Sequence, residues 1–216
     1  APRVEWALPP GLTAGALEWP APARIAVGPL VNFGYPGEML LAASITVSRD
    51  LAAGAPRDLR AQAKWLVCNH DECIPGSAAL SLILPVGTAG DVTPAITRLF
   101  AATRRQLPVA PPATWRVAAT NDADRLTLTV RGATSADGAP PFFFADDREA
   151  LEPSAAQPVT REPDGFRLAL TPRTAVPAAL AGVLSLGDRA YTIDVPITAA
   201  LTGFSVIPLV LAFAGG

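Results

Sequence analysis

The sequence contains few of the residues that most catalytic and metal sites use. Its 216 residues include only two cysteines and one histidine. Two cysteines exclude a scaffold held by several disulfides. A single histidine leaves a Ser-His-Asp triad with His70 as its one possible base, and no Gly-x-Ser-x-Gly elbow accompanies it. Because phosphate-binding loops and dinucleotide fingerprints are missing too, the common hydrolase and nucleotide-dependent classes are excluded.

Charge is also scarce, and the two signs nearly balance. Seventeen basic and nineteen acidic residues give a net charge of −2, so the basic surface that nucleic-acid binding requires is missing. A hydrophobic content of 50% excludes intrinsic disorder. The 23 prolines and 17 glycines leave little room for long helices. We therefore predict a β-rich, all-β chain without a nucleic-acid partner.

Alternating apolar and polar residues predict β-strands in both halves of the chain. Turn signals rich in Gly, Pro, Asp and Asn separate the segments, and an aromatic turn is expected at residues 32–37. The consecutive aromatics Phe142, Phe143 and Phe144 are expected in a core rather than in a docking patch, because a strand can be buried on both faces. The predicted strands span residues 25–31, 39–47, 59–67, 79–86, 115–119, 125–131, 141–145, 166–170, 181–186 and 191–197.

One short helix is predicted over residues 94–107. Thr93 can cap its first turn, and Pro94 suits its first position because that residue needs no hydrogen-bond donor. Arg104 and Arg105 complement the helix dipole in the last turn. Its apolar residues fall on one face, so we expect the helix to pack on a sheet edge and cover core.

A proline-rich stretch at residues 107–112 predicts a boundary between two β-sandwich lobes, 1–112 and 113–196. A single larger sandwich is the alternative. The uncharged apolar tail at 197–216 is expected to be the lead-in to a membrane domain, and a terminal strand followed by a tail is the alternative. Prolines and charges at the N-terminus suggest a chain from which an export signal has been removed.

The two cysteines, Cys68 and Cys73, fall in one short connection between predicted strands. A disulfide between them would close a ring of only six residues, and the loss of loop entropy would stabilise the fold by at most about 2 kcal/mol. Such a bridge is a weak staple, so we predict a pair that opens and closes by thiol-disulfide exchange. The alternative is a local structural disulfide in a noncatalytic interaction sandwich.

A second alternative is a metal site in the same connection. Between the cysteines lie His70, Asp71 and Glu72, and thiolate plus imidazole suits copper(I) or zinc. The alternative ligand set is therefore Cys68, His70 and Cys73. In the redox interpretation no metal or cofactor is expected, and His70 modulates the thiols while the two carboxylates raise their pKa.

Several short motifs occur in a characteristic order. Residues 32–35 read Asn-Phe-Gly-Tyr, 37–41 read Gly-Glu-Met-Leu-Leu, and 65–68 read Trp-Leu-Val-Cys. Cys-Ile-Pro follows at 73–75, and the chain ends in an apolar stretch at 211–216. In this order the motifs resemble the N-terminal periplasmic region of DsbD and ScsB type thiol:disulfide interchange proteins. The resemblance covers most of the chain and weakens in the second half.

The resemblance implies an immunoglobulin-like β-sandwich exported to the periplasm and tethered to the inner membrane. It implies that Cys68 and Cys73 are the redox pair and that Cys73 forms the mixed disulfides. Phe33 and Tyr35 resemble the flap that shields such a pair. The cysteine spacing is shorter than in better-known members, and Gly and Pro bracket the flap.

The resemblance also implies the partners of a protein-disulfide reductase module. The electron donor would be a thioredoxin-like domain of the same protein, supplied by a membrane domain C-terminal to this chain. The acceptors would be oxidised periplasmic thioredoxin-fold proteins. The second series of strands fits the ScsB-like branch, which is associated with copper tolerance, better than the shorter one-lobed kind.

Overall fold

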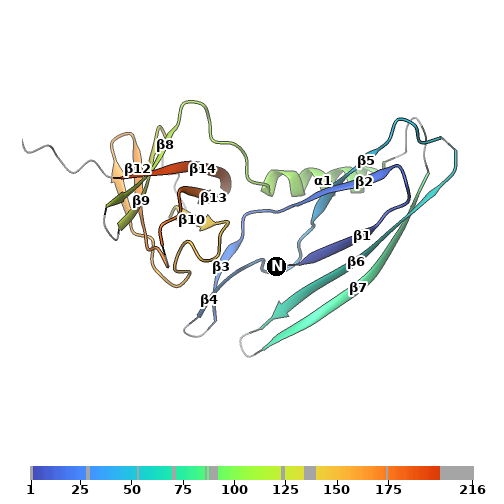
Figure 1. The fold of residues 1–216 in the computed structure, drawn as a ribbon, viewed down its shortest axis with the longest axis horizontal. Coiled ribbons are helices and arrows are strands. Elements are labelled where there is room, and N and C mark those ends of the chain that lie inside the picture. The colour runs from blue at the N-terminus through green and yellow to red at the C-terminus, as the bar shows by residue number, and fades with distance from the viewer. Residues whose placement is uncertain are drawn as a thin grey trace, which may run out of the picture.

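A computed structural model shows strands in two lobes, with one helix in the first (Figure 1). Among the residues that it describes, every regular element but this helix is a strand, so the predicted all-β class with one short helix is confirmed. The described residues are 2–27, 30–52, 54–69, 72–85, 87, 92–122, 125–133, 140–173 and 175–199.

The first lobe combines three small antiparallel sheets. The largest has the strand order β1-β6-β7, while β2 pairs with β5 and β3 pairs with β4. Its strands are β1 (Arg3–Ala7), β2 (Leu12–Glu18), β3 (Ala23–Val27), β4 (Leu30–Gly34), β5 (Ala42–Val47), β6 (Arg57–Cys68) and β7 (Cys73–Leu84).

The long β6–β7 hairpin shows why the sequence alternates here. Leu59 and Ala61 lie on one face of β6 and are buried, whereas Arg60 and Lys64 lie on the other face and are exposed. The predicted period of two is therefore confirmed. The two strands pair without a register shift from one end to the other, and the last rung joins Cys68 to Cys73.

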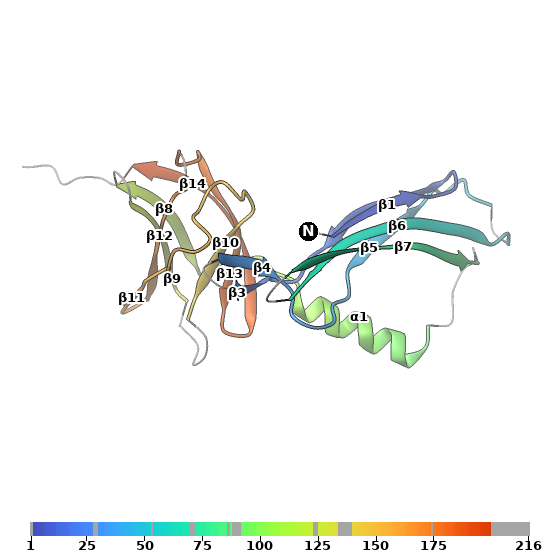
Figure 2. The same cartoon turned by 90° about the horizontal axis from the view of Figure 1, so that it is seen from below.

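The helix α1 (Pro94–Gln106) confirms its predicted bounds to within one residue. The backbone N–H of Ile96 donates to Thr93 Oγ1 at 3.4 Å, and two arginines occupy the last turn as expected. The helix lies on one side of the β1-β6-β7 sheet (Figure 2). Leu99 and Phe100 are nevertheless exposed, so the expectation that its apolar face covers core is wrong.

The second lobe is a sandwich whose two layers share one strand. The sheet order is β10-β13-β14-β8-β9-β12-β11, and β14 pairs antiparallel with β13 before pairing parallel with β8 through its last three residues. That strand therefore runs past the predicted boundary at residue 196. The strands are β8 (Arg116–Asp122), β9 (Arg125–Arg131), β10 (Phe142–Ala145), β11 (Val159–Glu162), β12 (Gly165–Leu170), β13 (Ala179–Leu186) and β14 (Arg189–Ala199).

The main hydrophobic core lies between the layers of the second lobe. Inward residues of the paired strands β9 and β12 lie side by side in register. Leu128 and Leu168 are one such pair, and both are fully buried. Phe143 adds a buried ring from β10, as its sequence context predicts. The other large core side chains include Leu126, Val130, Phe166, Leu170, Leu180, Leu184, Tyr191 and Ile193.

Aromatic rings join the two lobes. The ring of Phe33 on β4 meets those of Phe142 and Phe144 on β10 edge-to-face, with centroids 6.0 and 5.1 Å apart. The guanidinium of Arg24 donates to the Ser154 carbonyl at 3.1 Å. Phe142 and Phe144 thus contact the first lobe. Phe143 and Phe144 are both buried, as predicted, whereas Phe142 is half-buried.

The structure describes the chain around the predicted boundary at residue 112 but not most of the predicted membrane lead-in. The proline-rich stretch at 107–112 contacts the second lobe, since Val109 forms an isolated bridge with Tyr191. Each sheet of the described residues is nevertheless built only from strands before residue 112 or only from strands after it. Within the described part of the chain, no helix has the length and apolarity to cross a membrane. Residues 200–216, which hold most of the predicted lead-in, lie outside the described residues.

Candidate functional site

The two cysteines form a disulfide at the tip of the β6–β7 hairpin. Cys68 is the last residue of β6 and Cys73 the first of β7, so they occupy the final rung of the ladder. Their Cα atoms lie 4.0 Å apart. The sequence placed both cysteines in the connection between strands, whereas the structure places them in the strands themselves.

The turn beyond the disulfide sets the geometry of this last rung. Asn69 N–H donates to the Glu72 carbonyl at 2.9 Å, and Glu72 N–H donates to Asn69 Oδ1 at 2.8 Å. The rung of Asn69 and Glu72 is therefore hydrogen-bonded, which makes the Cys68–Cys73 rung the non-hydrogen-bonded kind. Side chains approach most closely in rungs of that kind, so the backbone pairing brings the two sulfurs together.

The predicted copper alternative depends on a residue between the cysteines. His70, the third ligand of that set, lies outside the described residues, as does its neighbour Asp71. In this oxidised form Cys68 and Cys73 are bonded to each other, and neither sulfur is a thiolate that could bind a soft metal. The metal alternative thus stays a prediction about the reduced protein.

The disulfide lies among exposed apolar side chains. Leu66, Val67 and Ile74 are 63%, 61% and 55% exposed, and both cysteines are exposed as well. An incoming thiolate must approach a disulfide from outside along the S–S axis, and nothing described around the tip buries it. The arrangement can accept attack by a thiol of another protein.

A tryptophan side chain lies across the hairpin three rungs from the disulfide. Trp65 is paired with Gly76, and a Cβ on that glycine would lie 2.5 Å from the indole Nε1 and Cε2 atoms. Only glycine leaves room for the indole this close to the neighbouring strand. This pair was not predicted from the sequence, although a glycine inside a strand is a signal of close approach.

The predicted flap residues have other neighbours in this structure. Phe33 is part of strand β4 and not of a turn, and its ring contacts the second lobe as described above. Tyr35 donates its hydroxyl to the Pro20 carbonyl at 3.0 Å and stacks on Trp19. Burial raises the pKa of Tyr35. The β3–β4 hairpin and the disulfide-bearing tip lie at the same end of the first lobe (Figures 1 and 2).

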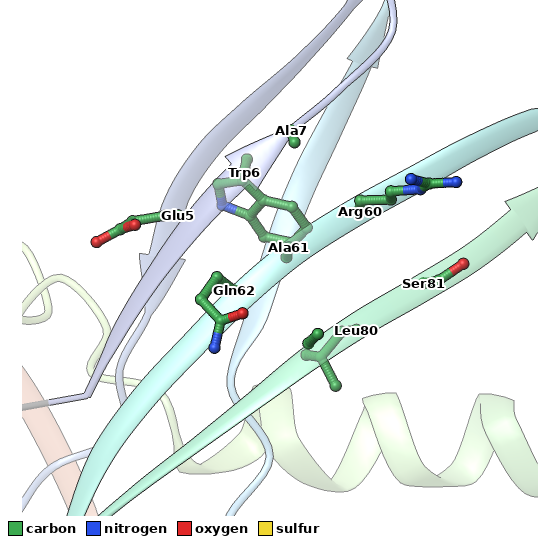
Figure 3. Close-up of a pocket in the computed structure, with 9 residues that line it drawn as sticks. Glu5, Trp6, Ala7, Arg60, Ala61, Gln62, Leu80 and Ser81 are labelled. Carbon is green, nitrogen blue, oxygen red and sulfur yellow. The ribbon is translucent and has the colours of Figure 1, made fainter.

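A shallow hollow of about 590 Å³ lies on the β1-β6-β7 sheet, away from the disulfide. Figure 3 shows the ring of Trp6 over Ala61, with Leu80 on the next strand. The polar residues at its rim include Glu5 and Arg60. The hollow offers apolar surface without an arrangement of nucleophile and base.

Comparisons with known proteins support the predicted resemblance. Residues 1–85 match the family model described as thiol:disulfide interchange protein DsbD, N-terminal. The fold is similar to the crystal structure of the N-terminal periplasmic domain of ScsB from Proteus mirabilis, with a TM-score of 0.67 and 16% identity over 92% of this chain and 77% of that chain.

Two further comparisons add nothing to the fold assignment. The CsuC-CsuE chaperone-tip adhesion subunit complex from Acinetobacter baumannii is 15% identical over 92% of each chain, but its TM-score of 0.17 is too low to indicate a shared fold. No curated protein matches the chain significantly. The first 85 residues thus match the DsbD N-terminal family, as the motifs predicted, and the chain shares the fold of the ScsB N-terminal periplasmic domain.

Proposed function

We propose that this chain is a thiol:disulfide interchange module that reduces partner proteins through Cys68 and Cys73. The observation that carries the proposal is the exposed disulfide on the last rung of the β6–β7 hairpin, inside the region that matches the DsbD N-terminal family. A buried or distant pair would suit a structural staple. A ring of six residues in an exposed tip contributes little stability and is open to exchange.

The exchange begins when a donor thiolate attacks Cys73 Sγ. The bond from Cys73 to Cys68 breaks, its electron pair leaves with Cys68 as a thiolate, and a mixed disulfide forms. The donor's second thiolate then attacks the donor's first sulfur, which is bonded to Cys73 in the mixed disulfide. This attack releases Cys73 as a thiolate. Two electrons have now passed to the module. The reduced pair transfers them to an oxidised partner by the same steps in reverse.

The proposed setting is the periplasm. There a thioredoxin-like domain of the same protein would donate electrons that it receives from a membrane domain, and oxidised thioredoxin-fold proteins would accept them. The family match and the likeness to a periplasmic domain support this setting. The same relay requires protection of the reduced pair from stray oxidants, and we assign that role to Phe33 and Tyr35 in a conformation with the β3–β4 hairpin over the tip.

Single cysteine variants test the exchange. With an oxidised thioredoxin-fold protein as partner, Cys68→Ser should trap a mixed disulfide through Cys73, whereas Cys73→Ser should form none. The double variant is the control for background adducts on denaturing gels. Trapping by Cys73→Ser alone would reverse the roles of the cysteines. No adduct with either variant, together with a reduction potential below about −300 mV, would mark an inert structural bridge.

A separate experiment tests the flap. Replacing Phe33 and Tyr35 by Ala should speed the reaction of the reduced protein with a small oxidant, because the sulfurs lose their cover. The rate is read from the loss of free thiol over time. Equal rates in the variant and the parent protein would contradict the flap assignment and leave the exchange chemistry untouched.

A further inference from the structure

The strand that carries Cys73 is an edge strand. In the sheet order β1-β6-β7, strand β7 pairs with β6 on one side, and among the described residues no strand pairs with its other side. Figure 1 shows β7 as the outermost strand of the first lobe. Its free edge runs the whole length of the strand, from Cys73 to Leu84.

The hydrogen-bonding pattern shows which backbone groups this edge presents. Rungs of an antiparallel ladder alternate, and the rung of Asn69 and Glu72 is hydrogen-bonded. Counting along the ladder, Ile74 and every second residue after it bond to β6. The intervening residues direct their N–H and C=O groups outward; after Pro75 they are Ser77, Ala79, Ser81 and Ile83. Pro75 fits this pattern, because a missing N–H at an edge position breaks no bond to β6.

Beyond Pro75, the edge lacks the features that usually prevent strand addition. Proteins protect exposed edges with charged residues, prolines, bulges or very short strands. Strand β7 has twelve residues, none of them charged, and pairs with β6 without a register shift. Leu80, Leu82 and Ile83 are exposed. Backbone groups and apolar side chains along β7 therefore offer an added strand both hydrogen bonds and contact area.

We propose that the β7 edge from Ser77 to Ile83 binds an extended apolar segment of the thiol partner as an added strand and directs the partner's cysteine to Cys73. This inference rests on the proposed exchange function. The disulfide is continuous with the edge, since Cys73 begins β7. Pro75 offers no N–H, so pairing ends there and the partner chain can leave the ladder beside the sulfur.

The occupant is thus an uncharged β-strand with a cysteine just beyond its paired residues. Its thiolate attacks Cys73 Sγ, the bond to Cys68 breaks, and Cys68 leaves as the thiolate. The exposed apolar pair of Leu66 and Pro75, which lies next to the disulfide rung on the same face, gives the partner a further contact. Strand addition places the two reacting sulfurs side by side before the covalent step.

Synthetic peptides test this docking on the oxidised protein. The probe is a ten-residue peptide of alternating valine and threonine with one cysteine near the end, and its twin carries N-methyl groups on alternate backbone amides. The twin keeps the thiol and side chains but cannot pair as a strand on the β7 side. We expect the unmodified peptide to form the mixed disulfide about tenfold faster, measured by mass spectrometry. Dithiothreitol, which needs no docking, gives the reference rate.

Position 79 supplies matched protein variants. Ala79→Pro removes one outward N–H, whereas Ala79→Val keeps it and adds a good strand former. We expect Ala79→Pro to slow the unmodified peptide and to leave the dithiothreitol rate unchanged, with Ala79→Val reacting like the parent. If Ala79→Pro fails to fold, the two peptides on the parent protein still decide the question.

The remaining outcomes overturn the proposal in distinguishable ways. Equal rates for the two peptides would overturn strand addition and leave the exchange function standing. If neither dithiothreitol nor either peptide opens the disulfide, the exchange function fails as well. If the peptide-free protein sediments as a dimer that Ala79→Pro converts to a monomer, a second copy occupies the edge, and the proposed partner strand does not.

Discussion

The two lobes are both built from strands with alternating apolar residues, but they bury those residues to different extents. In the second lobe, side chains such as Leu128 and Leu168 meet across neighbouring strands and are fully buried. In the first lobe, the corresponding apolar face of β7 leaves Leu80 and Leu82 exposed. The disulfide and the free edge lie in the open lobe. Stability therefore resides mainly in the second lobe, while the first keeps surface available for a partner.

The difference has a cause in residue size. The apolar face of the β6–β7 hairpin contains Ala61, Ala63 and Ala78, which bury little area and so contribute little to the hydrophobic free energy. The strands β9 and β12 place leucine, valine and phenylalanine at their inward positions. Larger side chains such as Leu80 and Leu82 share the hairpin face with these alanines. They stay exposed because, among the described residues, no layer of large side chains covers them.

The largest expected effect comes from truncating the same residue type in the two lobes. Leu128 is 0% exposed and Leu82 is 56% exposed. Leu128→Ala should lower the free energy of unfolding of the second lobe by about 2–5 kcal/mol, because it removes buried methyl groups and leaves a cavity. Leu82→Ala should change the stability of the first lobe by no more than about 0.5 kcal/mol. Native-state hydrogen exchange reads the two lobes separately. Equal losses would remove the distinction between them.

A smaller effect is expected from the tight contact in the open lobe. Gly76→Ala places a methyl group against the Trp65 ring, and the forced shift should lower the free energy for opening the hairpin by about 1–3 kcal/mol. In a Trp65→Ala background the same change should cost almost nothing, as a double-mutant cycle measures. Gly87→Ala is the control, because nothing lies within 4 Å of a Cβ at that position. An equal cost in both backgrounds would show that the ring is not the obstacle.

The sequence predicted best where one strand determines its own pattern. Strand β9 was predicted with the bounds that the structure shows, residues 125–131, because strict alternation of apolar residues identifies a half-buried strand without knowledge of its neighbours. The Thr93 cap likewise predicted the start of α1. The short spacing of the two cysteines also made a local disulfide feasible, and the structure contains it.

Features that depend on distant partners were missed. Strand β1 exists because it pairs with β6, more than fifty residues along the chain, and its five residues show no strong local signal. Phe33 was expected in a turn because Gly and Pro surround it, but pairing with Arg24 extends strand β4 through it. The apolar face of α1 predicted a buried contact that the sheet does not supply. Register and lobe contacts depend on which surfaces meet, and local sequence does not encode that choice.

The contact between the lobes gives the third prediction. Phe33→Ala removes the ring that meets Phe142 and Phe144, and aromatic pairs of this kind contribute about 0.5–1.5 kcal/mol. We expect faster hydrogen exchange of the β4 and β10 amides and no change in the second-lobe core around Leu128. Phe33→Leu keeps most of the apolar area and should show a smaller increase. If exchange in β10 is unchanged in both variants, the ring does not hold the lobes together.

The smallest expected effect concerns an exposed carboxylate on the polar face of the hairpin. Hydrogen bonds from Arg60 and then Ser81 lower the pKa of Asp58. A lowered pKa in the folded state stabilises the fold above the unfolded value of about 3.9, and this contribution is lost as pH falls through the folded pKa. Arg60→Gln should therefore move the Asp58 pKa upward, as followed by carbon NMR of the side chain, with Ser81→Ala giving a smaller shift. The disulfide exchange rate at neutral pH should stay the same. The Asp58 charge affects stability only at low pH, whereas the proposed docking to β7 uses backbone groups.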